Sequence, residues 1–229
     1  MSLNHLAIIP DGNRRWAKAH LLLPWQGHEQ GVKRFWEIAQ AAVDLDIKYL
    51  TLWAASYSNL AKRTKKEVSV LFGLMRSELQ KPELRKQFED TETRLRIFGE
   101  WEQFIDDEKL IVDVKEFTDH TKKFSKLNLT ILFGYDGQRE MLSAISKLKD
   151  SGEEVSEENL RKNLWIGDLP DVDLVIRTGG EPHWSAGFMM WLTANSQFYF
   201  TETLWPDFKT EQLKTAIESF NSRQRRLGE

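Results

Sequence analysis

Short runs of β-prone residues alternate along the chain with longer stretches whose apolar residues recur at helical spacing. Apolar or alternating runs predict strands at residues 5–9, 49–55, 95–97, 127–133, 172–176 and 198–200. Apolar stripes at i, i+3, i+4 and i+7 predict amphipathic helices that include residues 32–43, 68–79, 138–149 and 213–220. A strand followed by a helix, repeated about six times, is typical of an α/β domain built on a largely parallel sheet.

The composition favours one water-soluble domain over residues 1–229, because 41% of the residues are hydrophobic and no linker or repeat divides the chain. The formal net charge of -3 excludes an overall basic field for nucleic acid, so any positive site is local. The absence of cysteine excludes thiolate catalysis and sulfur-ligated metals. Since no signal-peptide pattern or uncharged run of about 20 residues occurs, we expect a cytoplasmic protein.

Three polar segments follow predicted strands directly, at residues 11–16, 56–63 and 177–185. In open sheets of parallel strands, ligands bind in the crevice outside the carboxyl ends of the strands. Because all three segments lie at such ends, we expect them to contribute to one site. Each segment alone also has an ordinary structural explanation.

The first segment combines a carboxylate, a glycine and two guanidinium groups directly after a buried strand. If a helix begins near Asn13, its free N–H groups together with Arg14 and Arg15 form a cradle for an anion, and Asp11 can hold a divalent cation beside it. A diphosphate with bound magnesium fits this arrangement. The structural alternative is that Asp11 caps the helix and the two arginines are solvated surface residues.

The third segment places Arg177 at the end of an apolar strand, before Gly179 and Gly180, whose backbone amides can approach a ligand closely. It predicts a second anion site, with a glycine turn and a salt-bridged arginine as the structural alternative. The second segment, residues 56–63, carries hydroxyl and amide groups that are also common in turns. Among the five histidines, His28 follows a glycine at the mouth of a predicted helix and joins the candidates.

Five stretches occur in a fixed order: HLAIIPDGNRRW at residues 5–16, GH at 27–28, GYDGQRE at 134–140, DLVIRTGGE at 173–181 and YFTETLWPDF at 199–208. Together they resemble the cis-prenyltransferase family, which includes the undecaprenyl diphosphate synthases and isoprenyl transferases. The resemblance runs from about residue 5 to Gly228 and covers nearly the whole chain. No P-loop, dinucleotide fingerprint, HExxH motif or nucleophile elbow competes with it.

The resemblance implies a homodimer whose α/β subunit has a central six-stranded, mainly parallel sheet, flanking helices and a hydrophobic tunnel. It implies a magnesium-dependent condensation of isopentenyl diphosphate with an allylic diphosphate, farnesyl or geranyl diphosphate, giving a Z-polyprenyl diphosphate such as undecaprenyl diphosphate. Two alternatives stay open: a short-chain or irregular condensation on the same fold, and a noncatalytic partner subunit. A lipidic product also implies peripheral membrane association.

The resemblance assigns roles to individual residues. Asp11, associated with magnesium, and Asn59, which helps to remove a proton, are the catalytic residues. The residues that bind the allylic diphosphate are Gly12, Asn13, Arg14, Arg15, Trp16, His28, Ser56 and Arg63. Those that bind isopentenyl diphosphate are Arg177, His183, Ser185, Arg226 and Gly228. The metal ligands are Asp11 and Gln197.

The apolar stripes of two predicted helices supply candidates for the tunnel wall, although such stripes are also typical of plain core: Phe35, Trp36, Val68, Leu71, Phe72 and Met75. The sequence departs from the family pattern inside the site. Pro10 stands in place of a methionine, Pro24 or Trp25 in place of an arginine, His183 in place of an arginine, and Gln197 in place of a glutamate. These departures affect which substrate and product we expect.

Overall fold

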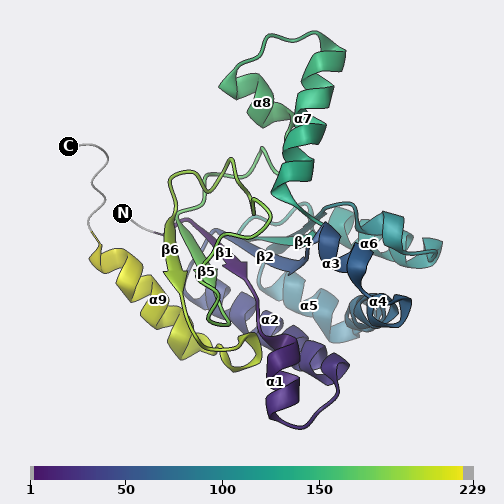
Figure 1. Cartoon of the computed structure of the whole chain (residues 1–229), viewed down its shortest axis with the longest axis vertical. Coiled ribbons are helices and arrows are strands. Elements are labelled where there is room, and N and C mark those ends of the chain that lie inside the picture. The colour runs from purple at the N-terminus through teal and green to yellow at the C-terminus, as the bar shows by residue number, and fades with distance from the viewer. Residues whose placement is uncertain (1–2, 224–229) are drawn as a thin grey trace.

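The strands of the protein form one sheet in which every neighbouring pair runs parallel (Figure 1). The computed structural model describes residues 3–223. The strand order across the sheet is β3-β4-β2-β1-β5-β6. The strands are β1 (His5–Ile9), β2 (Tyr49–Ala55), β3 (Thr93–Phe98), β4 (Leu127–Phe133), β5 (Leu174–Arg177) and β6 (Gln197–Phe200).

Helices connect the strands from β1 to β5, and a further helix follows β6. The helices are α1 (Asn13–Ala19), α2 (Pro24–Asp44), α3 (Tyr57–Lys62), α4 (Lys65–Leu79), α5 (Pro82–Asp90), α6 (Glu108–Thr121), α7 (Gly137–Ser151), α8 (Glu157–Asn163) and α9 (Thr210–Ser222). Of these, α2, α5 and α9 pack on one face of the sheet. Two short 3-10 helices are η1 (Trp101–Phe104) and η2 (Trp205–Asp207). Local signals fix several ends: Thr64 and Glu67 form a capping box at the start of α4, and Gly152 ends α7 in the left-handed region.

Side chains alternate across the central strand β1, so successive residues face opposite layers of the fold. Leu6 and Ile8 are fully buried in a cluster formed with α2, α5 and α9. Ala7 and Ile9 are buried on the other face, against side chains of residues 164–192, a stretch that is irregular apart from β5. Because both faces are covered, the strand is a continuous apolar run rather than an alternating one.

The predicted fold class is confirmed, and the strands predicted at residues 5–9, 49–55 and 127–133 have those bounds. Helix α2 contains the predicted residues 32–43 and begins earlier, at Pro24, because proline is suited to the first helical turn. The expectation that a helix follows every strand is wrong. No helix separates β5 from β6, since residues 178–196 form turns and irregular chain.

The connections that leave β1 and β5 diverge, because β1 leads through α1 and α2 to β2 on one side, while β5 leads to β6 on the other. Such a divergence opens a crevice at the carboxyl ends of neighbouring parallel strands. Away from this crevice, α7 and α8 stand out from the sheet as an arm (Figure 1). Within residues 3–223, the helices are too short or too polar to cross a membrane.

Candidate active site

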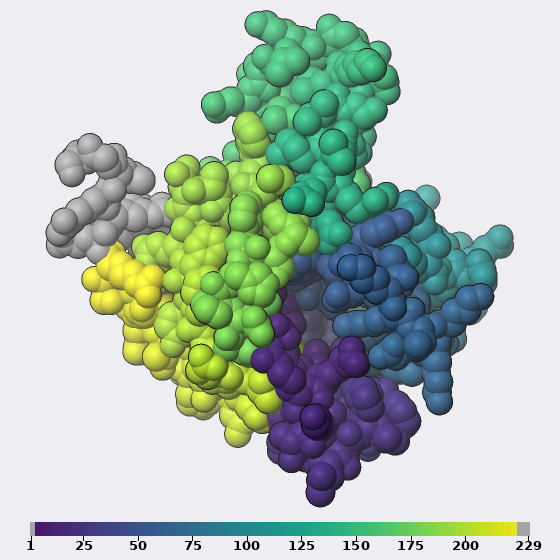
Figure 2. Space-filling model, in the orientation of Figure 1, coloured from purple at the N-terminus to yellow at the C-terminus, as the bar shows by residue number. Residues whose placement is uncertain are grey.

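A cavity of about 1100 Å³ opens at the carboxyl ends of β1, β2 and β5. Figure 2 shows a hollow where the purple, blue and yellow-green parts of the chain meet. Side chains from all three polar segments named above line the cavity, so the chain does bring these segments together. The candidate residues in its wall are Asp11, Gly12, Asn13, Arg14, Arg15, His28, Ser56, Asn59, Arg63, Arg177 and Ser185.

Asp11 connects the first and third segments. One carboxylate oxygen, Oδ1, lies 3.1 Å from Nη2 of Arg15, and the other, Oδ2, accepts a hydrogen bond from Nη2 of Arg177 at 3.2 Å. Its backbone is fixed as well, because its N–H donates to the Thr178 hydroxyl at 2.8 Å and its carbonyl accepts from the N–H of Trp205 at 2.9 Å. The carboxylate is 35% exposed, so it faces the cavity while both guanidinium groups hold its orientation.

Arg177 is a buried cation at the end of β5, with only 6% of its side chain exposed. Its Nη1 donates to the carbonyl of His183 at 3.0 Å and to the hydroxyl of Ser185 at 2.5 Å. Its Nε is buried and has no hydrogen-bond partner among residues 3–223. A buried charge with an unused donor at a cavity wall is suited to an anionic ligand, which would supply the missing acceptor.

Glycines allow the backbone of the site to pack closely around Asn13. A Cβ on Gly27 would lie 2.1 Å from the backbone oxygen of Asn13, and one on Gly31 would lie 2.4 Å from its Oδ1. Gly12 has a φ of 113° and passes against Leu204, where a Cβ would lie 2.8 Å from a side-chain carbon. The start of α2 therefore lies directly against the β1–α1 turn, and this contact fixes the Asn13 amide at the cavity.

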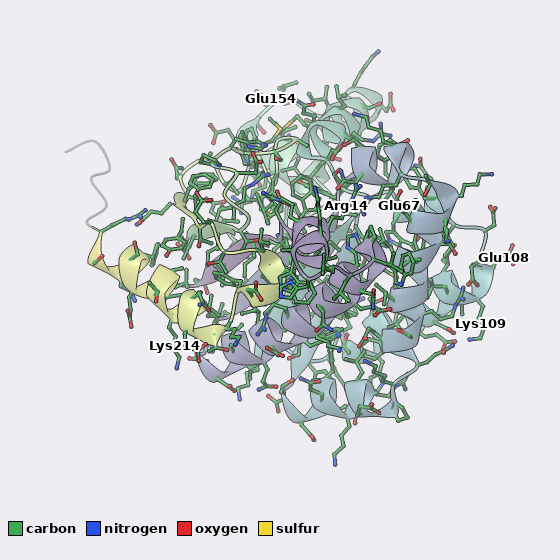
Figure 3. The ribbon with its side chains drawn as sticks, turned by 60° about the horizontal axis from the view of Figure 1, so that its bottom comes forward. Arg14, Glu67, Glu108, Lys109, Glu154 and Lys214 are labelled. Atoms are coloured by element: carbon green, nitrogen blue, oxygen red, sulfur yellow. The ribbon has the colours of Figure 1, made fainter. Side chains whose placement is uncertain are left out.

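Basic side chains crowd His28 on the α2 side of the cavity. Burial, followed by the positive charges of Arg63 and Arg14, lowers the pKa of His28 from 6.5 to about 4. Burial and the neighbouring Arg14 also lower the pKa of Arg63. Glu67, which accepts hydrogen bonds from Thr64, lies on the same side as Arg14 (Figure 3). Excess positive charge in a partly dry cavity favours binding of a multiply charged anion.

The loop after β2 is held by local and long-range hydrogen bonds. Ser56 caps α3, because its hydroxyl accepts from the backbone N–H of Asn59 at 2.9 Å and lies 3.2 Å from the Ser58 hydroxyl. Burial raises the pKa of Asp136, while hydrogen bonds from the backbone of Ser58 and Tyr57 oppose that shift. Sequence reasoning missed this supporting role of Asp136, although an aspartate directly after a predicted strand was an available signal.

A second, apolar cavity of about 160 Å³ continues from the polar one. The two share wall residues, namely Pro10, Asn13, His28, Trp53 and Ala54. Of the tunnel candidates, Phe35, Trp36, Leu71 and Met75 line the apolar cavity. Val68 and Phe72 do not line it: they are buried in the cluster of α4, α6 and η1, because they lie on an adjacent face of α4.

One carboxylate interrupts the apolar wall. Glu78 accepts a hydrogen bond from Nε1 of Trp36 at 2.9 Å and from Nζ of Lys81 at 2.7 Å. Its side chain is mostly buried, whereas Lys81 is half exposed, so the pair lies between the cavity and solvent. The Trp36 ring also packs edge-on against Phe88. This indole–carboxylate–ammonium cluster closes one side of the apolar cavity.

Two candidate residues lie beside the cavity rather than in its wall. Trp16 donates from Nε1 to Asp207 Oδ1 at 2.9 Å and stacks on His20 with ring centroids 4.1 Å apart. His183 is exposed, and its Nε2 lies 2.9 Å from the Ser185 hydroxyl. The first residue supports α1, and the second contacts the cavity only through its neighbour.

Gln197 does not join the other candidates within the subunit. It is the first residue of β6 and pairs with Leu174, at the end of the sheet away from Arg177. Arg226 and Gly228 lie outside the described residues. Within residues 3–223, no group of three or more histidine, aspartate or glutamate side chains is arranged to hold a metal ion, and Asp11 is the candidate carboxylate in the wall.

Residues 9–228 match the family model described as undecaprenyl diphosphate synthase. An isoprenyl transferase of Neisseria gonorrhoeae is 39% identical over 225 residues, which cover 98% of this chain and 88% of that protein. An isoprenyl transferase of Thermotoga maritima is 39% identical over 231 residues, covering 98% and 96%. The fold and these similarities define a prenyltransferase. The chain belongs to the undecaprenyl diphosphate synthase family.

Two solved structures have the same fold. Lavandulyl diphosphate synthase from Lavandula x intermedia, in complex with dimethylallyl diphosphate, superposes with a TM-score of 0.90 at 28% identity and covers 99% of this chain and 98% of that one. A probable undecaprenyl diphosphate synthase from Campylobacter jejuni superposes with a TM-score of 0.81 at 30% identity and covers both chains fully, at 100%. The lavandulyl diphosphate synthase structure therefore has its ligand, dimethylallyl diphosphate, bound.

Proposed function

We propose that the protein condenses isopentenyl diphosphate with an allylic diphosphate, farnesyl or geranyl diphosphate, and releases a Z-polyprenyl diphosphate. The observation that carries this proposal is the direct connection between a polar cavity rich in cations and an apolar cavity. A prenyl diphosphate has this division within one molecule, with a charged head and an alkyl tail. The cavity pair therefore complements such a substrate in both charge and polarity.

The two cationic regions suit the heads of two different substrates. Arg177 and Ser185 are proposed to bind isopentenyl diphosphate, with His183 beside them. The allylic head would lie nearer the apolar cavity, because its tail must enter that cavity. Its proposed ligands are the turn of residues 12–15 and the side chains of His28, Ser56 and Arg63.

The proposed reaction needs stabilisation of charge more than covalent help from the protein. As the allylic C–O bond breaks, the diphosphate gains negative charge, and the positioned donors of Asn13, Arg14 and Arg63 would stabilise that charge. The double bond of isopentenyl diphosphate then attacks the allylic carbon. A proton is finally lost near Asn59. Because the amide of Asn59 is a poor base, a diphosphate oxygen or water would accept the proton, and Asn59 would orient that acceptor.

Magnesium fits the residues present, with Asp11 as its ligand. Mg²⁺ commonly takes one or two carboxylates and completes its coordination with substrate phosphates and water, so a single carboxylate in a cationic cavity is sufficient. When bound, the metal would neutralise charge on the leaving diphosphate. Within one subunit, Gln197 lies at the end of the sheet away from Arg177 and does not reach this metal site. We therefore propose that Gln197 contributes to the metal site of a second subunit.

Several further features are consistent with a homodimer of this single-domain chain. Leu142 and Ile145 on α7 are 69% and 50% exposed, and the edge strand β6 ends in the exposed Phe200. Burial of such side chains between two copies would remove apolar surface from water. We propose a cytoplasmic homodimer, in which Arg226 and Gly228 reach a diphosphate across the interface.

A short-chain or irregular condensation is the second candidate function. The apolar cavity is small compared with the few hundred Å³ or more of typical ligand pockets, and Glu78 closes one side of it. A solved relative of this fold is a lavandulyl diphosphate synthase bound to dimethylallyl diphosphate. A noncatalytic partner subunit is disfavoured, because the chain keeps Asp11 and the buried Arg177 in one cavity.

Product analysis separates these functions. The purified protein is incubated with magnesium, isopentenyl diphosphate and either farnesyl or geranyl diphosphate, and products are identified by mass spectrometry. We expect chains lengthened by whole five-carbon units. Product from dimethylallyl diphosphate alone would instead favour the irregular reaction. Absence of product with every allylic primer would refute the proposed function.

A further inference from the structure

Residues 21–25, with the sequence LLLPW, run from the end of α1 into the first turn of α2 and are exposed along their whole length; we refer to them as the LLLPW loop. Leu21 is 96% exposed, Leu23 51%, and Leu22 and Trp25 each 37%. Soluble proteins expose single apolar side chains routinely, but consecutive ones mark an interaction surface. The lobe that carries this loop projects at the lower edge of the molecule in Figures 1 and 2.

Hydrogen bonds on both sides hold the LLLPW loop in one shape. The N–H of Leu21 donates to the carbonyl of Lys18 at 3.2 Å and that of Leu22 to Ala17 at 2.8 Å, which is the Schellman pattern at the end of α1. The N–H of Leu23 donates to the Gln26 side chain at 2.9 Å at the start of α2. The apolar side chains are therefore presented by a fixed turn.

Leu21 occupies a position that normally belongs to glycine. Its φ is 57°, in the left-handed region where a side chain with a Cβ is strained. Folding of this chain alone gains little from the Leu21 side chain, since water surrounds nearly all of it. A strained and exposed leucine is explained if a surface outside the subunit takes up its side chain.

Basic side chains lie next to the loop. Lys18 and Arg14 line the polar cavity together with Leu21 and Leu22. On the opposite side of the loop, Nζ of Lys66 lies 5.7 Å from the ring centroid of Trp25. The nearby acidic groups are Glu29, exposed on the first turns of α2, Glu67, next to Arg14, and Asp207, which accepts a hydrogen bond from Trp16.

We propose that the LLLPW loop inserts into the surface of an anionic lipid bilayer and thereby places the mouth of the active-site cavity at the membrane. Leucines enter the acyl boundary, indole rings favour the interface, and lysines attract acidic headgroups. Residues of the loop line the cavity mouth itself. This inference rests on the proposed function in one respect, because a prenylated product would then be released directly into lipid.

A bilayer suits this surface better than a protein partner or a second copy. The lobe that carries the loop bulges outward at the lower edge of the molecule (Figure 2), and the cavity that Leu21, Leu22 and Pro24 line is the polar active-site cavity, not an apolar groove for a helix or strand. A deformable lipid surface accepts such a bulge without a matching shape. Closure of the loop over bound substrate is the competing explanation, and the experiment includes an outcome for it.

The test is co-sedimentation of the purified full-length protein with vesicles, in the absence of substrate. One vesicle set contains phosphatidylcholine and phosphatidylglycerol in equal parts, and the other contains phosphatidylcholine alone. The variants are Leu21→Gly, which suits the backbone, and Leu21→Ser combined with Leu22→Ser and Leu23→Ser. The control combines Val112→Ser with Val155→Ser. These valines are 51% and 84% exposed and lie outside the LLLPW loop, so the control removes exposed apolar side chains elsewhere on the surface.

We expect the parent protein and the control to bind the anionic vesicles, and the triple variant to bind them about tenfold or more weakly. Leu21→Gly should weaken binding less while its melting temperature stays equal or rises, because glycine relieves the left-handed strain. Binding should also fall with added salt and with phosphatidylcholine alone.

Two results would overturn the inference: absence of vesicle binding by the parent protein, or equal binding by the triple variant. The triple variant is also assayed on micellar or short-chain substrates. If it loses turnover there while the parent protein does not bind vesicles, the loop would be assigned to closure of the site instead. Because sedimentation is measured without substrate, it is independent of prenyl transfer. Failure of product formation would therefore refute the proposed function and leave this result standing.

Discussion

Replacement of Asp11 by asparagine separates the electrostatic role of this residue from its role in holding the site together. The carboxylate lies 3.1 Å from Arg15 and 3.2 Å from Arg177. Asparagine has the same shape and keeps an acceptor oxygen, but it carries no charge and is a poor ligand for magnesium. If the proposed function is correct, the substitution removes stabilisation of the transition state and leaves the packing intact.

The structure sets the expected magnitudes. Arg177 is buried and keeps two hydrogen-bond acceptors, Ser185 and the carbonyl of His183, while Arg15 is half exposed and also donates to Gly179 at 2.6 Å. We therefore expect Asp11→Asn to lower the free energy of unfolding by about 1 kcal/mol or less. Asp11→Ala, which removes an acceptor from a buried cation, should cost about 1–3 kcal/mol. Both should lower turnover by roughly 10²-fold or more.

The assay measures product formation at saturating substrate together with urea unfolding of the same preparations. Asp168→Asn is the matched control, because it removes the charge that pairs with the mostly buried Arg96 while neither residue lines the cavity, so it should leave turnover unchanged. Near-normal turnover of Asp11→Asn would show that the carboxylate charge is not needed. Equal loss of activity in the control would show that the effect comes from the fold.

Three other expectations follow from the same contacts. The pKa of His28 is about 4 in the folded protein against 6.5 in the unfolded chain, so the free energy of unfolding falls by up to about 3 kcal/mol as the pH falls from 6.5 to 4. In urea unfolding at several pH values, His28→Gln should reduce this dependence of stability on pH. An unchanged dependence would exclude His28 as a cause. Gly31→Ala should displace the Asn13 amide, since the new Cβ would meet Asn13 Oδ1 at 2.4 Å, and should raise the KM for the allylic substrate with little change in melting temperature; an unaltered KM would contradict it. Trp36→Ala should open the side of the apolar cavity closed by Glu78 and shift products toward longer chains in mass spectra, so an unchanged length distribution would show that the cluster does not limit elongation.

The chain order of strands and helices could be predicted because each element carries its own local signal. Apolar or alternating runs defined β1, β2 and β4 to the residue, and the polar segments after β1, β2 and β5 identified much of the cavity wall. Local patterns were weaker where no periodicity exists. The first turns of α2, before residue 32, lie outside the predicted apolar stripe, and residues 178–196 form irregular chain where the repeating pattern led us to expect a helix.

Contacts between distant residues were decided only in three dimensions. A stripe on α4 defines an apolar side but not its neighbours, so Leu71 and Met75 line the cavity while Val68 and Phe72 pack into core. The family resemblance, which assigned Gln197 to the metal, did not reveal that this residue begins β6 at the end of the sheet away from Arg177.

The sequence alone therefore determined the α/β class, the three polar segments that line the cavity and the family, because these depend on short-range patterns and on motifs kept in order. Only the tertiary structure decided the pairing of Asp11 with Arg177, the closure of the apolar cavity by Glu78, and the position of the LLLPW loop at the cavity mouth. The physical reason is that strand pairing brings together residues more than a hundred positions apart, and their distances depend on packing that no local pattern specifies.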